Sequence, residues 1–256
     1  MTAKSELIPA LDCLRLTLGG SKGNVLDASM IGALREALTK AKADKRVRAI
    51  VIDAEGKDFC FGASVEEHLP KTVAVMLAQL HGLLLGMIEA PTPVLIAVQG
   101  RCLGGGLELA LAGSRIIAAK TATFGQPEVK LGLFAPAASV LLNERVRPAI
   151  AEDLLITGRT IEAPEAFALG VIDELTDGSP LDAALAYVEK NLQSLSRTGL
   201  RFACKAARAQ RAAKLRPKLE RLERLYLEEL MKTPDAIEGL NAFLAKRPAK
   251  WAEISA

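Results

Sequence analysis

The fold is indicated most clearly by one stretch of the chain, Ala97-Val98-Gln99-Gly100-Arg101-Cys102-Leu103-Gly104-Gly105-Gly106-Leu107-Glu108. A short apolar run leads into three glycines and then into small and apolar residues, a pattern that predicts a strand, a tight turn and a helix. Glycine has no Cβ, so this turn can approach a ligand closely, and the N–H groups that open the helix can hold a developing negative charge. A turn needed only for helix packing is the alternative. The stretch lacks the lysine of a P-loop and the GxGxxG spacing of a dinucleotide site.

Working outward from this stretch, predicted strands and helices alternate. We expect strands at residues 11–18, 47–52, 94–98 and 114–118, an extended piece at 122–126, a helix at 72–89, and almost wholly helical structure after Ala135. Ile31, Leu34 and Leu38 have helical spacing, and Asp27 or Ser29 could cap their helix. The pattern predicts an α/β core at residues 1–195 and a helical C-terminal region at residues 196–256.

A second loop, Phe59–Ser64, also follows a predicted strand. Gly62 permits a bend that could point the Ala63 N–H inward. Two N–H donors that converge on one oxygen form an oxyanion hole, in which each donor typically lowers the barrier by about 3 kcal/mol. Such loops are common, so this one alone is weak evidence for a site.

Two glutamates lie in apolar surroundings. Glu108 is flanked by Leu107 and Leu109, and Glu128 lies between Phe124 and Val129 in sequence. An unpaired buried carboxylate is costly, so each is either satisfied by neighbours or used in chemistry. A pair of carboxylates in such surroundings suits general acid/base catalysis.

The amino-acid composition narrows the classes of protein to which the chain can belong. Half of the 256 residues are apolar, a quarter are charged and the net charge is +3, which is typical of an ordinary globular enzyme. The four cysteines form no CxxC pair, so a disulfide framework or a metal site is not expected, and a reducing compartment is. No signal-peptide pattern or membrane-length apolar run is seen, so we expect a cytoplasmic protein without a membrane partner.

Several blocks together carry a family resemblance. In order along the chain they are Gly23-Asn24-Val25-Leu26, Phe61-Gly62-Ala63-Ser64, Gly104-Gly105-Gly106-Leu107-Glu108, Phe124-Gly125-Gln126-Pro127-Glu128, Thr157-Gly158-Arg159 with residues 163–171, and residues 238–247. They resemble the crotonase (enoyl-CoA hydratase/isomerase) family. The similarity covers roughly residues 11–251 in unbroken order, which makes it specific.

The resemblance implies a spiral of ββα turns with a helical C-terminal region that assembles homotrimers or dimers of trimers. It implies that the N–H groups of Ala63 and Gly105 bind the thioester oxygen of an acyl-CoA substrate. Glu108 would activate water, and Glu128 would handle the carbon-bound proton. Because members with a single carboxylate tend toward isomerase or other chemistry, the presence of both favours hydration.

The resemblance also implies the contacts to CoA, which is part of the substrate, so no separate cofactor is expected. The implied CoA-binding residues are Val25, Ala63, Ser64, Val65, Phe243 and Lys246. The loop at residues 63–65 would meet the adenine and pantetheine. Phe243 and Lys246 would reach the nucleotide of a neighbouring subunit, with Lys246 as a point charge for the phosphates.

Two blocks depart from the usual enoyl-CoA hydratase pattern. Phe61-Gly62-Ala63-Ser64 replaces Ala-Gly-Ala-Asp, and residues 132–139 lack the usual glycines. Ala135, Pro136 and Ala138 would form a stiff apolar wall of the acyl pocket. Both variants resemble cyclohexa-1,5-diene-1-carbonyl-CoA hydratases of anaerobic benzoyl-CoA degradation, which implies 1,4-addition of water to give 6-hydroxycyclohex-1-ene-1-carbonyl-CoA.

Other functions are weighed against this one. The first alternative is a linear enoyl-CoA hydratase or isomerase of fatty-acid β-oxidation. A crotonase-fold RNA-binding protein would use the basic stretch at residues 201–224, but interspersed glutamates and few aromatic residues argue against a nucleic-acid partner. A non-catalytic CoA-binding scaffold would not need both Glu108 and Glu128. His68 and His81 have no Ser or Cys motif as partner, so we expect no catalytic role for them.

Overall fold

The structure, a computed structural model, describes residues 3–252. Within this range six strands form the main sheet, in the order β1-β2-β3-β4-β6-β9. Their bounds are β1 (Lys4–Ile8), β2 (Cys13–Leu18), β3 (Ala49–Ala54), β4 (Val94–Val98), β6 (Arg115–Ala119) and β9 (Glu174–Thr176). β1 is antiparallel to β2, and the other neighbours are parallel. The central strands β3 and β4 are buried along their whole length, as expected for the continuous apolar runs of a parallel sheet.

A smaller sheet carries the segments that lead to the candidate site. In the described part of the chain it has three strands, β5 (Arg101–Leu103), β7 (Thr123–Gly125) and β8 (Thr160–Glu162), in that order. β5 is parallel to β7, and β7 is antiparallel to β8. β5 leads into the glycine turn, and β7 leads to Glu128, so this pairing sets the two segments beside each other.

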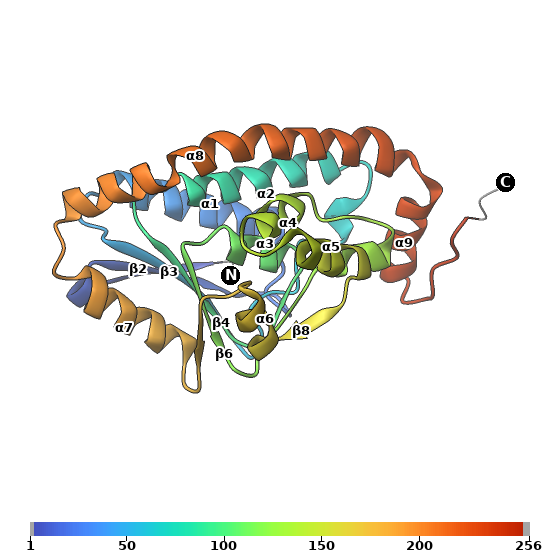
Figure 1. Cartoon of the computed structure of the whole chain (residues 1–256). Helices are drawn as coiled ribbons and strands as arrows, with labels where there is room; N and C mark the ends of the chain where they lie inside the picture. Colours follow the sequence, from blue (N-terminus) through green and yellow to red (C-terminus); the bar gives the residue numbers. More distant parts are fainter. Residues whose placement is uncertain (1–2, 253–256) are drawn as a thin grey trace.

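Helices cover both faces of the main sheet (Figure 1). On one face lie α1 (Ala28–Ala43) and α2 (Val73–Ile88), with α8 (Arg197–Arg224) running along their outer side (Figure 1). On the other face, Ala184 and Val188 of α7 (Pro180–Leu192) pack against alternate β-strand residues such as Val51 and Leu95. Both faces of the sheet are therefore shielded from water, which is the arrangement that parallel strands require.

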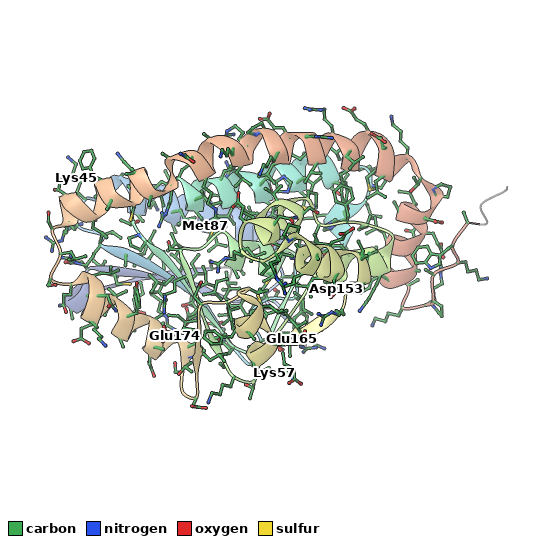
Figure 2. The ribbon with its side chains drawn as sticks, in the orientation of Figure 1. Lys45, Lys57, Met87, Asp153, Glu165 and Glu174 are labelled. Carbon is green, nitrogen blue, oxygen red and sulfur yellow. The ribbon has the colours of Figure 1, made fainter. Side chains whose placement is uncertain are left out.

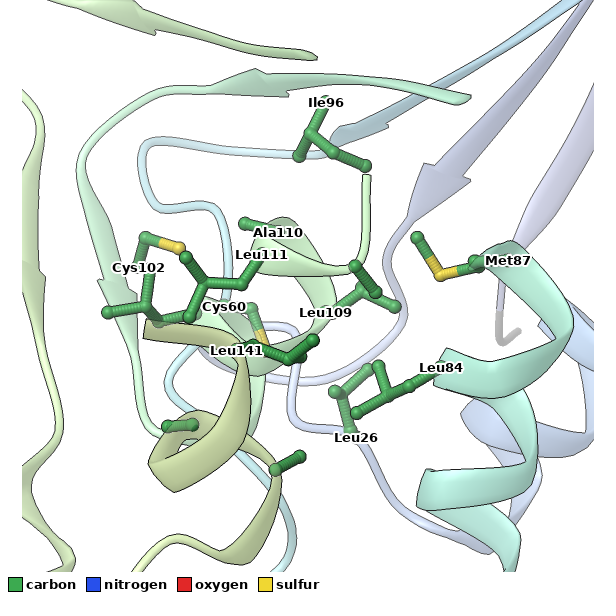
Figure 3. Close-up of a cluster of buried hydrophobic side chains, with 14 of the residues drawn as sticks. Leu26, Cys60, Leu84, Met87, Ile96, Cys102, Leu109, Ala110, Leu111 and Leu141 are labelled. Carbon is green, nitrogen blue, oxygen red and sulfur yellow. The ribbon is translucent and has the colours of Figure 1, made fainter. Parts of the chain in front are cut away.

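The remaining helices are shorter than α1, α2, α7 and α8. They are α3 (Gly105–Leu111), α4 (Pro136–Leu141), α5 (Pro148–Thr157), α6 (Ala163–Leu169) and α9 (Pro234–Leu244), with short 3₁₀ turns at Pro9–Leu11, Glu66–His68, Pro127–Leu131, Leu142–Glu144 and Leu230–Lys232. Leu109 and Leu111 of α3 lie in one apolar cluster with Leu84 of α2 and Leu141 of α4 (Figure 3). α3 is thus fixed on several sides by buried side chains.

The surface and interior separate as the composition predicts. The labelled charged residues Lys45 and Lys57 lie on the outside, whereas Met87 is buried in the core (Figure 2). No helix among residues 3–252 combines the length and the apolar character needed to cross a membrane.

The mixed α/β architecture predicted from the sequence is confirmed. Asp27 caps α1 by accepting a hydrogen bond from the Met30 N–H at 2.8 Å, and the predicted apolar positions of that helix are buried. The long C-terminal helix begins at Arg197, directly after its capping residue Ser196. The division of the chain at residue 196 stays a prediction. Leu215 and Leu240, which lie beyond that residue, belong to the same apolar core as the sheet.

One expectation was wrong. The chain after Ala135 is not almost wholly helical, because β8 and β9 lie there and pair with β7 and β6. Each is only three residues long, too short for alternation to be read, and each is stabilised by a partner far away in sequence. The three-residue strand β5 was missed for the same reason, and the five-residue β1 was missed because it is mostly exposed and has no apolar alternation.

Candidate active site

The glycine turn and the second loop meet at their backbones. Gly104 has φ of +51°, a conformation that favours glycine, and it directs the chain from β5 into α3. A Cβ placed on Gly105 would lie only 2.9 Å from the Ala63 nitrogen, so the two segments are almost in contact. Within residues 3–252, no backbone acceptor is found for the N–H of Ala63, and Gly105, as the first residue of α3, has none inside its helix. Two free donors therefore lie side by side.

Glu108 lies in the first turn of α3 and is only 3% exposed. Its Oε1 accepts a hydrogen bond from the Ala138 N–H at 2.8 Å, at the start of α4. Burial raises the pKa of Glu108, while the nearby His81 ring and the N–H groups of Ala138 and Ala137 act in the opposite direction. Glu108 is thus a buried carboxyl group whose ionised form has dedicated partners.

Glu128 lies in the 3₁₀ turn Pro127–Leu131 and is half-buried. Its carboxyl group lies against the glycine turn, since a Cβ on Gly104 would be 2.5 Å from Glu128 Oε1. Burial, and after it the negative charge of Glu108, raises the pKa of Glu128 to about 8. At neutral pH this carboxyl group is therefore mainly protonated and can act as an acid.

Gln126 is a neighbour of Glu128 that the sequence did not single out for the site. It is 1% exposed, and when its NH₂ faces the carboxylate it donates to Glu128 Oε2 at 3.0 Å and to Oε1 at 3.2 Å. When the amide is turned over, its carbonyl oxygen can accept from the protonated acid instead. One amide can thus serve both protonation states of Glu128.

These groups line one cavity of about 70 Å³. Its wall combines the two carboxyl groups and the glycine turn with mostly apolar side chains: Phe61, Gly62, Ala63, Val65, His68, Leu77, Leu80, Gly104, Gly105, Glu108, Pro127, Glu128, Leu131, Leu133, Phe134, Ala135, Pro136 and Leu240. An oxygen held by the two free N–H groups could gain negative charge while one carboxylate removes a proton and the other carboxyl group supplies one. This is the equipment for acid/base chemistry next to an activated carbonyl.

The structure brings most of the predicted residues together. Seven of them line the cavity: Ala63, Val65, Gly105, Glu108, Glu128, Ala135 and Pro136. Ala138 is not among the lining residues; it is fully buried and meets the site through its N–H to Glu108. Phe243 is 53% exposed at the end of α9, Lys246 is exposed just beyond that helix, and neither lines this cavity.

The other predicted CoA contacts lie at the edge of the site. Ser64 is 8% exposed, and its hydroxyl donates to Glu66 Oε2 at 3.1 Å. Val25 is partly buried before α1 and does not line the cavity. A second hollow of about 520 Å³ shares Phe61 with the cavity and is lined by Lys22, Lys57 and other polar residues.

Several lining residues were not predicted from the sequence. Leu77 and Leu80 come from α2, and their helical spacing marked them only as core residues. Leu240 comes from α9, near the other end of the chain, and nothing local indicates its place. His68 lines the cavity while its Nδ1 contacts the Ser64 carbonyl at 2.7 Å. Among residues 3–252, no three His, Cys, Asp or Glu side chains gather into a possible metal site.

Comparison with known proteins identifies the family and the relatives to which the chain is similar. Residues 14–254 match the sequence profile of the family described as enoyl-CoA hydratase/isomerase. The chain is 51% identical over 238 residues to cyclohexa-1,5-dienecarbonyl-CoA hydratase of Thauera aromatica, covering 93% of this chain and 92% of the relative. It is 36% identical to a probable enoyl-CoA hydratase of Rhizobium meliloti (strain 1021), with 89% of each chain covered.

Solved structures agree with the sequence relatives. Carnitinyl-CoA hydratase from Mycobacterium avium has a TM-score of 0.86 and 31% identity, with 98% of each chain covered. An enoyl-CoA hydratase/isomerase from Pseudoalteromonas atlantica T6c has a TM-score of 0.85 over 98% of this chain and 100% of that one. The fold predicted from the sequence motifs is thereby confirmed, while assembly into trimers stays a prediction.

Proposed function

The chain belongs to the enoyl-CoA hydratase/isomerase family, and we propose that it is an acyl-CoA hydratase that adds water to cyclohexa-1,5-diene-1-carbonyl-CoA. The product is 6-hydroxycyclohex-1-ene-1-carbonyl-CoA. The observation that carries this proposal is the 51% identity, over nearly the whole chain, to a relative named for this activity. The apolar cavity with two carboxyl groups and two free N–H donors supports it.

The proposed reaction assigns a role to each group. The Ala63 and Gly105 N–H groups hold the thioester oxygen. Glu108 takes a proton from water as the water oxygen bonds to the ring carbon β to the thioester. Electrons move through the ring to the thioester oxygen and form a dienolate, which the two donors stabilise. Glu128 then gives its proton to the γ carbon at the far end of the diene, and the remaining ring double bond lies between the α carbon and its other ring neighbour.

The cavity wall supports a cyclic acyl group. Ala135 and Pro136 present a compact apolar surface, and Pro136 opens α4 with the fixed φ of proline. Phe134 adds an aromatic face beside them. Ala138 contributes by holding Glu108 through its N–H. A flat apolar ring makes favourable contact with such a wall and loses little conformational freedom on binding.

The CoA portion of the substrate would lie outside the cavity. Val25, Ala63, Ser64 and Val65 are proposed to contact it, and Lys22 and Lys57 of the neighbouring hollow offer positive charge to its phosphates. Phe243 and Lys246 are proposed to act on the nucleotide of another subunit. Because proton transfer and an oxyanion hole suffice, no cofactor beyond the substrate's own CoA is proposed.

We also propose a homotrimer or a dimer of trimers in the cytoplasm. Large apolar side chains are exposed on three short helices of the C-terminal half of the chain. Ile156 of α5 is 65% exposed, Phe167 of α6 is 48% exposed and Phe243 of α9 is 53% exposed. Exposed apolar groups of this kind favour association between subunits.

The test compares turnover of cyclohexa-1,5-diene-1-carbonyl-CoA with that of crotonyl-CoA by chromatography of the CoA products. We expect the ring diene to be hydrated with at least about 100-fold higher kcat/KM, the range that the shape of an apolar pocket can supply. A preference for crotonyl-CoA would overturn the substrate assignment and favour the second candidate, a linear enoyl-CoA hydratase, which the name of the Rhizobium relative supports. Glu108→Gln is the inactive control for both substrates.

A further inference from the structure

Tyr226 is a buried polar residue that the proposed reaction does not use. It is 1% exposed, and its hydroxyl has no hydrogen-bond partner within residues 3–252. A buried hydroxyl without a partner typically costs about 1–3 kcal/mol, so native proteins rarely keep one without a reason. The question is which group this hydroxyl serves.

The position of Tyr226 points to the candidate active site. Tyr226 lies in a π-helical turn, Leu225–Glu229, that follows α8 directly. Its ring packs edge-on against Phe134, with centroids 5.2 Å apart and an interplanar angle of 61°. Phe134 lines the cavity together with both carboxyl groups. Single π-helical turns often occur at functional sites, because the extra residue shifts a side chain out of the regular helical register.

The charges near Tyr226 favour a neutral, donating hydroxyl. Burial, and after it the negative charges of Glu128 and Glu108, raises the pKa of Tyr226. The phenol therefore keeps its proton throughout the working pH range. Its hydroxyl acts as a hydrogen-bond donor and not as an acid. Of these two carboxyl groups, Glu108 already accepts from Ala138, whereas Glu128 is the one that must become ionised during the proposed hydration.

We propose that Tyr226 is a positioning residue of the acid/base pair, whose hydroxyl donates a hydrogen bond to the Glu128 carboxylate as it loses its proton. The inference deepens the proposed function and rests on it. Catalytic hydrogen bonds are often long in the unliganded enzyme and tighten when the substrate is bound, which is consistent with a hydroxyl that is still unpartnered. The bond strengthens as charge develops on Glu128, so it lowers the barrier rather than merely aiding substrate binding.

Other titratable groups surround this part of the site. From α2, His81 pairs through Nδ1 with Glu223 of α8, and its Nε2 is buried without a partner among the described residues. Glu108 faces the region from α3 and Glu128 from the 3₁₀ turn. Glu228 and Glu229 of the π-helical turn and Lys232 beyond it are exposed. These groups also influence the pH profile. The titration of Glu128 itself must therefore be measured in a Tyr226 variant.

The experiment uses Tyr226→Phe, which keeps the ring against Phe134 and removes only the hydroxyl. We expect kcat about 10- to 100-fold lower, as is usual for one hydrogen bond to a charged group, with KM changed less than about twofold. The alkaline limb of the pH profile should move to higher pH, because ionised Glu128 loses a donor. Tyr187→Phe is the matched control. Tyr187, the other tyrosine of the chain, lies on α7, and the guanidinium group of Arg115 lies over its ring.

A purely structural Tyr226 gives a different result. Removing an unsatisfied hydroxyl would then leave kcat and the pH profile unchanged and the thermal stability equal or higher, and this outcome would overturn the inference. In the Glu128→Gln background, Tyr226→Phe should have no further effect on the residual rate. A full additional loss there would also contradict a role that acts through Glu128.

One readout separates this inference from the proposed function. Carboxyl-¹³C labelling of glutamate allows the titration of Glu128 to be followed by NMR, with its signal assigned by its loss in Glu128→Gln. Tyr226→Phe should raise the pKa of Glu128 whichever acyl-CoA the enzyme hydrates, and an unchanged titration would refute the hydrogen bond. Failure of the wild type to hydrate the ring diene, by contrast, refutes only the substrate assignment.

Discussion

The segments that carry Glu108 and Glu128 provide their carboxyl groups with different surroundings. Glu108 lies in a helix whose residues are all buried, and it accepts a hydrogen bond from Ala138 at 2.8 Å. Glu128 lies in a half-buried 3₁₀ turn, where the charge of Glu108 adds to the effect of burial on its pKa. Depth alone would place the proton on Glu108. The partners act in the other direction, because N–H groups and His81 favour the charged state of Glu108, whereas the charge of Glu108 favours the protonated state of Glu128.

This difference supports the roles proposed for the pair. A base must be ionised and an acid must be protonated when substrate arrives, and two carboxyl groups achieve this when their environments push their pKa values apart. In the proposed reaction Glu108 takes the proton from water and Glu128 delivers one to carbon. The most direct way to break the comparison is to neutralise each group in turn.

Glu108→Gln and Glu128→Gln should each lower kcat by about 10²- to 10⁴-fold, the usual contribution of a general acid or base. Gln keeps the size of each side chain, and the amide oxygen of Gln at position 108 can still accept from Ala138. The two variants should differ in the alkaline limb of the pH profile. Glu108→Gln removes the like charge beside Glu128, so the pKa of Glu128 should fall and the alkaline limb should move to lower pH, whereas Glu128→Gln removes the group whose proton loss causes that limb.

Steady-state kinetics across pH measure these effects, and circular dichroism confirms that each variant is folded. If either variant kept wild-type kcat, the acid/base pair would have to be abandoned. If the alkaline limb of Glu108→Gln stayed at the wild-type pH, the electrostatic link between the two carboxyl groups would be contradicted.

The oxyanion site provides the next largest effect, because its donors stabilise the thioester oxygen whichever carboxyl group is acting. Gly105→Ala places a methyl group 2.9 Å from the Ala63 nitrogen, so one or both N–H donors must move away from the thioester oxygen. Loss of one such donor typically lowers kcat about 10²- to 10³-fold. Gly32→Ala is the matched control, since a Cβ there meets nothing within 4 Å. A Gly105→Ala enzyme as active as the Gly32→Ala enzyme would remove the proposed oxyanion hole.

Much of the fold could be predicted from local patterns. The strand at residues 94–98 and the cap of α1 at Asp27 were correct, because apolar runs and capping residues act over a few positions. The strands β8 and β9 could not be predicted, because three residues carry no period and their stability comes from distant partners. Motifs identified the two glycine-containing segments and both glutamates as a set.

The surroundings of those groups depended on contacts that sequence does not display. Leu240 and Tyr226 are more than 90 residues from Glu128 along the chain, yet they contribute to the cavity wall or the layer behind it. The hydrogen bond from Ala138 reaches Glu108 through a backbone N–H, which leaves no signature in side-chain type. Residue types therefore indicated the candidate catalytic groups, and the packing supplies the different surroundings from which their roles are proposed.

The pH dependence of kcat/KM is the smallest of the expected effects. It tests most directly whether Glu108 and Glu128 differ as proposed. In the proposed reaction, hydration starts with Glu108 ionised and Glu128 protonated, and dehydration starts with the proton on Glu108 instead. Both starting states contain one proton on the pair, so kcat/KM in the two directions must depend on the same macroscopic ionisation. Because the pKa of Glu128 is raised to about 8, that proton is lost as pH rises through about 8. We expect kcat/KM to fall about tenfold per pH unit above this point in both directions, measured on the ring diene and on its hydrated product. A flat profile up to pH 10 in either direction would show that the pair does not share its proton.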